Sequence, residues 1–164
     1  MTTAAPVTTA DAKVGDLTIH YAEMGEGEPL ICLHGTGPGA SGWASYRNNA
    51  PTFAATFRTL VPDLPRFGRS SKVPVTEPRL DFTSRAIRGF MDALGIEKAH
   101  IIGNSMGAQT ALKLAIDTPE RVDKLVLMAP AVAGYSLMSP MPTEAVRLIS
   151  EYYGGGGPSL DKMR

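Results

Sequence analysis

A pentapeptide at residues 103–107, GNSMG, stands between a short apolar run and a segment with helical spacing. The β-branched residues Ile101 and Ile102 come before it, and apolar residues recur at intervals of three and four after it, as in an amphipathic helix. A G-x-S-x-G pattern at a strand-to-helix junction is typical of a nucleophile elbow, a sharp turn that exposes a serine hydroxyl at the carboxyl end of a strand. Its glycines let the crossing backbones approach closely. The pattern therefore predicts that Ser105 is a nucleophile.

Short apolar runs alternate with helical segments along most of the chain. Residues 30–33 and 125–128 are wholly apolar, as expected for strands of a parallel sheet that is covered on both faces, and residues 59–61 predict another strand. Residues 80–94 have helical spacing and end at Gly95, a typical helix stop. This alternation predicts an α/β fold with a mostly parallel sheet and helices on both faces.

The N-terminal part has a weaker pattern. Residues 13–24 alternate between apolar and polar, which predicts two strands joined by a turn at Gly15 and Asp16. Residues 43–57 are mixed in character, and we expect one helix there. Residues 1–12 are expected to form a mobile tail.

The charges of the chain balance, with 16 basic and 16 acidic residues. Such a chain has no electrostatic attraction to nucleic acid or to an anionic membrane, so we expect a small-molecule substrate and neither of those partners. No stretch approaches the roughly 20 apolar residues of a membrane span. The single cysteine, Cys32, lies in an apolar run and cannot form an internal disulfide. A folded domain in the reducing cytoplasm is therefore expected.

A second glycine-rich loop follows the apolar run at residues 30–33 and reads HGTGPG. Beside a nucleophile elbow, such a loop supplies one backbone N–H to an oxyanion hole, and the residue after the nucleophile supplies the other. The donors would be the N–H groups of Thr36 and Met106. His34 precedes Ser105, whereas the triad histidine of this arrangement follows the serine, so we expect His34 to shape the loop through hydrogen bonds.

The same loop also fits another class of protein. Gly35, Gly37 and Ala40 satisfy the pattern G-x-G-x-x-A, and Asp63 ends the next strand, as in a dinucleotide-binding fold. Against this alternative, Pro38 lies where the phosphate-binding helix would begin, and it removes an N–H donor. No pair of histidines or acids has metal-ligand spacing. We therefore expect neither a dinucleotide nor a metal.

The two loops together resemble those of a known family. The sequence LHGTGPGASGW at residues 33–43 is similar to the oxyanion loop of the meta-cleavage product hydrolases, and GNSMG is similar to their nucleophile motif. Further similar stretches are FMDALGI at residues 90–96, PERV at 119–122 and SPMP at 139–142. These hydrolases belong to the α/β-hydrolase superfamily and break a carbon–carbon bond in ring-fission products of aromatic hydrocarbon catabolism. The resemblance runs from about residue 30 to residue 164 and implies the α/β-hydrolase fold.

The resemblance implies a substrate, a reaction and a set of site residues. The substrate would be a 2-hydroxy-6-oxo-hexa-2,4-dienoate, which is ketonised in the active site and then cleaved by water to a 2-hydroxydienoate and a carboxylic acid. Ser105 would be the nucleophile or the activator of water, Thr36 and Met106 would stabilise the oxyanion, and no cofactor is implied. The residues implied to contact the substrate are Gly35, Gly37, Ser45 and Asn104.

The chain departs from the family pattern at a few positions. Ser45 stands where the family usually has asparagine, Arg66 follows Pro65 where the family has glycine, Ser71 stands where aspartate is common, and Ala108 replaces a second glycine. The family also suggests how the chain is organised. Residues 13–133 would be the N-terminal part of the hydrolase core, and residues 134–164 the start of an incomplete lid.

Part of the catalytic machinery is absent from the sequence. A serine hydroxyl needs a histidine to take its proton and an acid to orient that histidine, and in this fold both follow the serine. No histidine follows Ser105. The later acids, all on the next helix, in the turn behind it or in the lid entry, are Asp117, Glu120, Asp123, Glu144, Glu151 and Asp161. We therefore expect the chain to be the N-terminal part of a longer hydrolase, truncated within the lid and inactive alone.

Two alternatives remain open. The first is a carboxylesterase-type α/β-hydrolase, and the second is a non-catalytic binding or structural fragment. In a fragment, the apolar strand at residues 125–128 would lie at or near a bare sheet edge, which is an aggregation liability. The expected partner is therefore a missing C-terminal half or further copies of the chain in a homo-oligomer.

Overall fold

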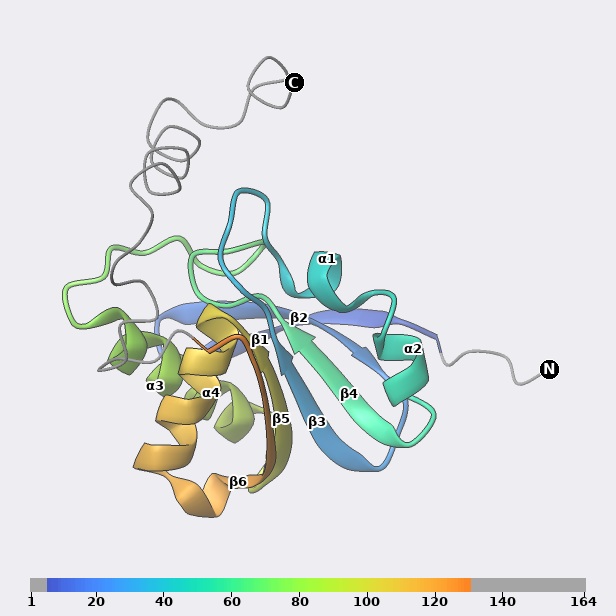
Figure 1. The fold of residues 1–164 in the computed structure, drawn as a ribbon. Helices are drawn as coiled ribbons and strands as arrows, with labels where there is room; N and C mark the ends of the chain where they lie inside the picture. Colours follow the sequence, from blue (N-terminus) through green and yellow to red (C-terminus); the bar gives the residue numbers. More distant parts are fainter. Residues whose placement is uncertain (1–5, 131–164) are drawn as a thin grey trace, which may run out of the picture. The chain divides into compact units, whose positions relative to one another are not determined.

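A six-stranded sheet with the order β1-β2-β4-β3-β5-β6 forms the centre of the protein in the computed structural model, which describes residues 6–130 (Figure 1). The strands are β1 (Thr8–Val14), β2 (Leu17–Met24), β3 (Glu28–Leu33), β4 (Phe57–Pro62), β5 (Ala99–Asn104) and β6 (Val122–Met128). The pairs β1–β2 and β2–β4 are antiparallel, and β4, β3, β5 and β6 run parallel. The mostly parallel sheet is therefore confirmed. The predicted lid entry at residues 134–164 lies outside the described residues.

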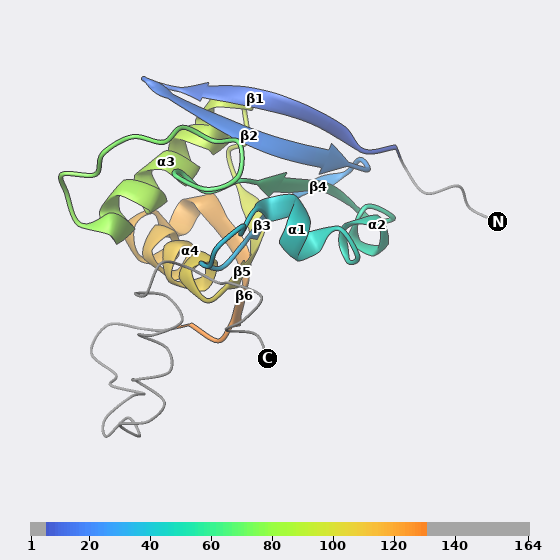
Figure 2. The same ribbon diagram turned by 90° about the horizontal axis from the view of Figure 1, so that it is seen from above.

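Helices cover both faces of the sheet, as predicted. They are α1 (Gly42–Tyr46), α2 (Ala50–Phe53), α3 (Arg79–Ala93) and α4 (Met106–Asp117), and a short 3-10 turn, η1 (Pro119–Arg121), precedes β6. Seen from above, α3 and α4 lie on one side of the sheet and α1 and α2 on the other (Figure 2). Within residues 6–130, no helix is long and apolar enough to cross a membrane.

Alternate residues of the central strands face two separate cores. Ile31 and Leu33 point toward α3 and α4, where they join a core that includes Phe90. Leu30 and Cys32 point the other way, into the core beneath α1 and α2. Burial of each large aliphatic side chain stabilises the folded state by roughly 1.5 to 3 kcal/mol. The apolar residues on both faces of β3 therefore favour a central position for this strand in the sheet. This arrangement explains why residues 30–33 are apolar without alternation.

The prediction of a mobile tail over residues 1–12 is wrong from residue 8 onward, because Thr8–Val14 forms β1. This strand pairs with β2 from Thr8 opposite Glu23 to Val14 opposite Leu17, around a turn in which Gly15 has φ +56°. Only Ala12 of β1 is buried. The strand therefore depends on backbone hydrogen bonds to β2, which leave no apolar pattern in the sequence.

The single helix expected over residues 43–57 is also wrong, because two short helices, α1 and α2, occupy this segment. Pro51 lies in the first turn of α2. A proline inside a helix clashes with the carbonyl four residues earlier, here that of Arg47, which caps α1. A helix that starts at residue 42 therefore cannot continue through residue 51.

Strand β6 is exposed on one face, contrary to the expectation of burial on both. Leu125 and Leu127 pack against the core beneath α3 and α4, whereas Val126 and Met128 are 51% and 40% exposed. The reason is that β6 is the last strand of the sheet, and α1 and α2 pack over β2, β3 and β4. An apolar stripe therefore remains open to solvent at this end of the described sheet.

Candidate active site

Ser105 lies between the end of β5 and the first residue of α4, as the motif predicts. Its backbone has φ +51° and ψ −113°, a left-handed conformation that is rare for a residue with a side chain. The Ser105 N–H donates to the carbonyl of Met128 at 2.9 Å, which fastens the turn to β6. Strained backbone of this kind concentrates at functional sites. The turn has the conformation of a nucleophile elbow.

The two glycines of the motif are required by close backbone contacts. A methyl group on Gly103 would lie 2.5 Å from the carbonyl oxygen of Gly107, across the turn. A methyl group on Gly107 would lie 2.2 Å from the carbonyl oxygen of Leu33. Both distances are well inside van der Waals contact, so any side chain at either position would displace the backbone. The expectation that small residues let the backbones cross is confirmed.

The glycine-rich loop after β3 lies directly against the elbow. A methyl group on Gly35 would lie 3.3 Å from the Cβ of Ser105 and 3.4 Å from the Nδ2 of Asn104. The next residue, Thr36, is exposed, and its N–H has no acceptor among residues 6–130. Met106 begins α4, so its N–H has no intrahelical acceptor and lies at the positive end of the helix dipole. Both N–H groups are therefore free to bind a developing oxyanion.

His34 holds this loop to the end of β4. The ring is fully buried, its Nδ1 donates to the carbonyl of Gly35 at 2.7 Å, and its Nε2 accepts the N–H of Leu64 at 2.9 Å. These two bonds place the proton on Nδ1 and use both nitrogens. Burial lowers the pKa of His34, partly offset by the Gly35 carbonyl and by the nearby charge of Asp63. The expected loop-shaping role of His34 is confirmed.

Asp63 also holds these loops together, although the sequence marked it only as part of a possible dinucleotide-binding pattern. Its carboxylate is 5% exposed and accepts the N–H of Gly42 at 2.7 Å and the N–H of Arg69 at 2.8 Å. Both oxygens are thus engaged inside the protein, which argues against the dinucleotide alternative. Instead, Asp63 joins the far end of the glycine-rich loop to the loop between β4 and α3. Its position at the carboxyl end of a strand is the only signal the sequence offered.

The remaining predicted contacts differ in their placement. Asn104 is exposed at the end of β5, with its amide beside Gly35. Gly37 has φ +145°, and its carbonyl accepts the N–H of Ala40 at 3.1 Å, which turns the loop. Ser45 is exposed on α1 and forms no side-chain hydrogen bond among residues 6–130. The structure therefore places Asn104 at the elbow, and it shows no contact between Ser45 and the elbow.

None of the three histidines of the chain is placed to take the proton of Ser105. Both ring nitrogens of His34 are bonded to backbone groups. His20 pairs with the carboxylate of Asp11 at 2.7 Å. His100 lies near the start of β5, paired with a carboxylate of β3 at 3.1 Å, whereas Ser105 follows the other end of β5. In residues 6–130, no group of three or more His, Cys, Asp or Glu side chains could hold a metal ion.

A serine turn at the carboxyl end of a parallel strand, with a glycine-rich loop packed beside it, defines the α/β-hydrolase class. The family model described as alpha/beta hydrolase fold matches residues 28–158, and the chain belongs to this family. The predicted fold class is thereby confirmed.

Relatives within this family support the predicted resemblance. The chain is 46% identical over 156 residues to a 2-hydroxy-6-oxo-6-phenylhexa-2,4-dienoate hydrolase of Comamonas testosteroni, with 94% of this chain and 54% of the relative covered. It is 44% identical over 164 residues to a 2-hydroxy-6-oxononadienedioate/2-hydroxy-6-oxononatrienedioate hydrolase of the same organism, with 99% and 57% covered. The chain thus spans about half the length of the curated relatives it matches.

A solved structure gives the same result. The meta-cleavage product hydrolase CumD of Pseudomonas fluorescens IP01, in a serine-to-alanine variant, superposes with a TM-score of 0.80 at 34% identity, over 94% of this chain and 53% of that one. The similarity to meta-cleavage product hydrolases is therefore confirmed in both sequence and structure.

Proposed function

We propose that this chain supplies the nucleophile and the oxyanion hole of a serine-dependent hydrolase that cleaves a carbon–carbon bond in 2-hydroxy-6-oxo-hexa-2,4-dienoate ring-fission products of aromatic catabolism. The observation that carries the proposal is the packing of Gly35 against Ser105. Thr36 follows Gly35 and Met106 follows Ser105 in the chain, which supports the assignment of their N–H groups as the two donors of the oxyanion hole. The names of the relatives, which are hydrolases of such dienoates, support the substrate class.

The reaction uses the oxyanion hole at the ketone carbon, C6. The substrate is first ketonised, and its C6 carbonyl oxygen then accepts hydrogen bonds from Thr36 and Met106 as negative charge develops on it. Each such donor contributes about 3 to 4 kcal/mol of transition-state stabilisation. Ketonisation moves the proton of the C2 hydroxyl group to C5. Ser105 then attacks C6 and forms an acyl-enzyme that water hydrolyses, or it activates the water that attacks C6 directly. The C5–C6 bond breaks, its electron pair passes along the conjugated chain to the C2 oxygen, and that oxygen takes up a proton. The products are a 2-hydroxydienoate and a carboxylic acid, and Asn104 helps to hold the dienoate.

The proton of Ser105 needs an acceptor that this chain does not provide. All three histidines are engaged elsewhere, and none follows Ser105. A serine without a base is a weak nucleophile. We assign the base and its orienting acid to a segment outside these 164 residues. By itself, the chain is expected to show no meaningful turnover.

A chimera tests the proposal. The 164-residue chain is joined to the C-terminal part of the phenylhexadienoate hydrolase of Comamonas testosteroni, whose N-terminal part it resembles. We expect the chimera to consume a 6-substituted dienoate, followed by loss of its absorbance, much faster than a simple carboxylic ester of similar size. Faster turnover of the ester would support a carboxylesterase instead. Binding of the dienoate without consumption would support a non-catalytic role.

A further inference from the structure

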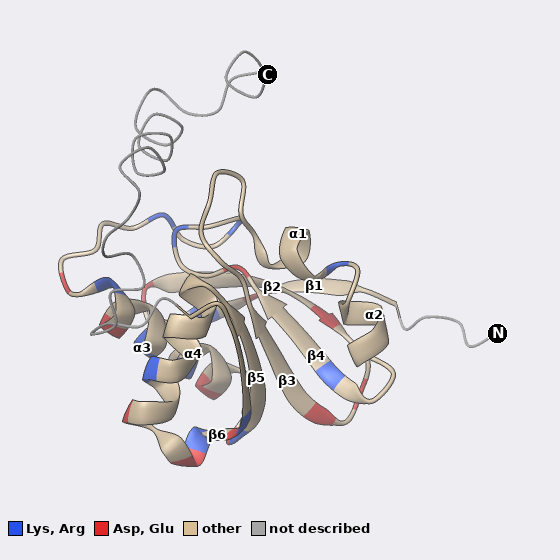
Figure 3. Cartoon of the chain, in the orientation of Figure 1, with Lys and Arg blue, Asp and Glu red and all other residues tan. Residues whose placement is uncertain are grey.

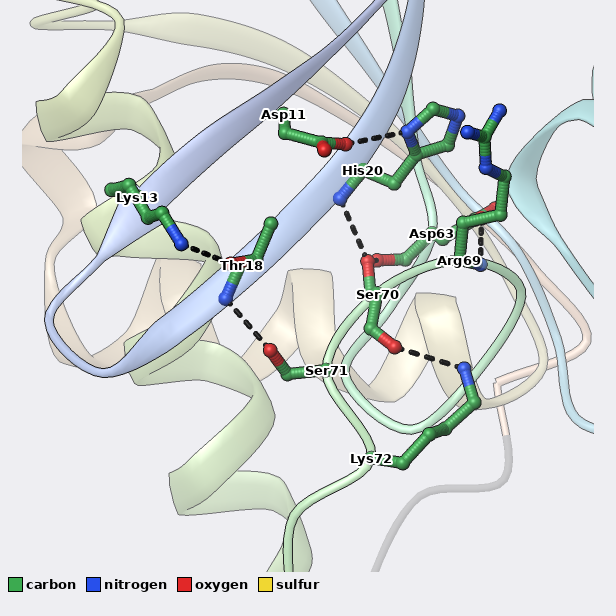
Figure 4. A network of polar contacts seen from close by, with 9 residues as sticks. All are labelled: Asp11, Lys13, Thr18, His20, Asp63, Arg69, Ser70, Ser71 and Lys72. Carbon is green, nitrogen blue, oxygen red and sulfur yellow. Dashed lines mark hydrogen bonds and ion pairs between the residues drawn. The ribbon is translucent and has the colours of Figure 1, made fainter.

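The loop between β4 and α3 is fastened to the edge of β2 (Figure 4). Ser70 Oγ accepts the N–H of His20 at 2.9 Å, and Ser71 Oγ accepts the N–H of Thr18 at 2.8 Å. The ammonium of Lys72 donates to three carbonyl groups of the same loop at 2.7 to 2.9 Å. This loop is therefore anchored at residues 70–72 and forms a platform beside β2.

Arg66 occupies an unfavourable backbone conformation on this platform. Its φ is +75°, and its N–H donates to the carbonyl of Ser71 at 2.9 Å. A residue that carries a Cβ atom is destabilised in this left-handed region, whereas glycine is not. Residues held in such conformations cluster at binding and catalytic sites.

Arg66 and Arg79 line the same small cavity, which has a volume of about 220 Å³. Its walls are mainly apolar and include Phe67, Phe82 and Met106, and no acidic residue lines it. Among residues 6–130, neither guanidinium has a hydrogen-bond or ion-pair partner. The cavity therefore combines an apolar interior with two unpaired cations that can bind a carboxylate in bidentate fashion.

The acids nearest in sequence to Arg79 are already neutralised by other cations. Glu77 accepts a hydrogen bond from Arg85 at 2.6 Å, and Asp81 pairs with Lys113 at 3.0 Å. The loop between β4 and α3 carries several basic segments and an acidic one before α3, and α3 and α4 carry charges of both signs (Figure 3). The positive charge at the cavity is therefore left for a ligand.

The cavity lies against the start of α4, because Met106, the residue after Ser105, is one of its lining residues. Its volume is below the roughly 300 to 1,000 Å³ of pockets that enclose a whole ligand, so it suits a substituent. We infer that it binds a carboxylate at the end of the C6 substituent of the dienoate. The favoured substrate is then a dianion with a short acidic chain on C6, and a phenyl ketone is disfavoured. The assignment of C6 rests on the proposed function, whereas the anion site does not.

A binding experiment on the 164-residue chain tests the anion site without catalysis. The probe is 4-oxopentanoate, which carries a ketone and a carboxylate on a short chain, and 4-oxopentanamide is its neutral control. We expect NMR titration to show saturable shifts of the Met106 and Phe67 amides with the anion, and binding of the amide weaker by at least about tenfold. Equal binding of the two probes, or no saturable shift, would overturn the inference.

Variants separate the two arginines from general charge effects. Arg66→Gly and Arg79→Gln are each expected to weaken binding of 4-oxopentanoate by at least about tenfold. Arg66→Gly should do so without loss of stability, since glycine favours the backbone found there. Arg88→Gln is the matched control, because this residue of α3 does not line the cavity. Variants that all bind like the parent chain would contradict the assignment.

The chimera connects this site to the reaction. There, Arg66→Gly should lower kcat/KM for a dienoate with an acidic C6 chain by at least about tenfold more than it lowers kcat/KM for the phenyl-substituted dienoate. If the anion binds but neither dienoate is consumed, the proposed function fails and the anion site stands. If both dienoates are consumed equally well with and without Arg66, the substrate assignment fails and the proposed function stands.

Discussion

Gly35 packs against Ser105 so closely that a methyl group on the glycine would lie 3.3 Å from the serine Cβ. We predict that Gly35→Ala folds, because a shift of a few tenths of an ångström relieves this contact at a cost of about 1 kcal/mol. The same shift displaces Thr36 from the oxyanion. The chimera should then lose about 10- to 100-fold in kcat, with urea unfolding as the control for stability. An unchanged kcat would show that this contact does not set the oxyanion hole.

Gly107→Ala should act on stability instead. The added methyl group would lie 2.2 Å from the Leu33 carbonyl, where only backbone could move away, so we expect a loss of about 1 to 3 kcal/mol in urea unfolding. Gly89→Ala is the matched control. There the methyl group meets only side-chain atoms of Val14, the nearest being Cγ1 at 2.4 Å, so a side chain and not the backbone has to move, and alanine favours the helix by about 1 kcal/mol. Equal effects of the two substitutions would refute the steric account of the elbow.

His34 should make the protein less stable in mild acid. Burial lowers the pKa of His34 below its ordinary value of 6.5, so the unfolded chain binds this proton first as the pH falls. The contribution of His34 is complete above that value and is lost as the pH falls toward the folded-state pKa, by at most about 1.4 kcal/mol per pH unit.

The measurement is the free energy of unfolding in urea at several pH values between about 7 and 5. His34→Gln removes the titration and retains polar groups that can bond to Gly35 and Leu64. We expect the pH slope to be shallower in this variant than in the parent chain. Identical slopes would mean that another group accounts for the acid sensitivity.

The exposed face of β6 should make the 164-residue chain self-associate. Val126 is 51% exposed on β6, the edge strand of the sheet that residues 6–130 form, an arrangement that favours edge-to-edge association. Val126→Lys should reduce concentration-dependent association in sedimentation velocity and leave the unfolding free energy within about 0.5 kcal/mol. Leu127→Lys is the contrasting variant, since Leu127 packs on the core and its substitution should unfold the chain. A parent chain that stays monomeric at all concentrations would contradict this prediction.

Much of the fold could be predicted because local patterns and tertiary packing agree. Helix α3 begins and ends within one residue of the predicted segment, and Gly95, with φ +64°, ends it while Ile96 donates to the Met91 carbonyl at 2.9 Å. The apolar run at residues 30–33 lies in a strand buried on both faces, as predicted. In both places the residues that favour the local structure are also those that the core needs.

The errors arose where structure depends on partners distant in the sequence. Strand β1 has little apolar pattern because its pairing with β2 holds it in place. The fragment alternative placed residues 125–128 at or near a sheet edge, but the exposure of the Val126 face could not be predicted, because it depends on which strands α1 and α2 cover.

The candidate site was predicted as far as its motifs extend. Ser105 and Gly35 belong to local patterns, and the structure brings them together. Asp63 and Arg66 are single residues on or beside a loop, where no periodic pattern indicates a role. Tertiary structure alone shows the hydrogen bonds of Asp63 and the cavity that Arg66 lines. The triad base could not be located, because no histidine follows Ser105 in this chain, and without the histidine none of the later acids can be assigned as its partner.

The central claim is that Ser105 is the nucleophile, and Ser105→Ala in the chimera tests it most directly. Alanine keeps the Cβ and the backbone of the turn, so dienoate binding, measured by the spectral change on mixing, should remain within a few fold of the parent. We predict that turnover falls by at least about a thousandfold, as expected when the reacting group itself is removed. Retention of full turnover by Ser105→Ala would contradict the account.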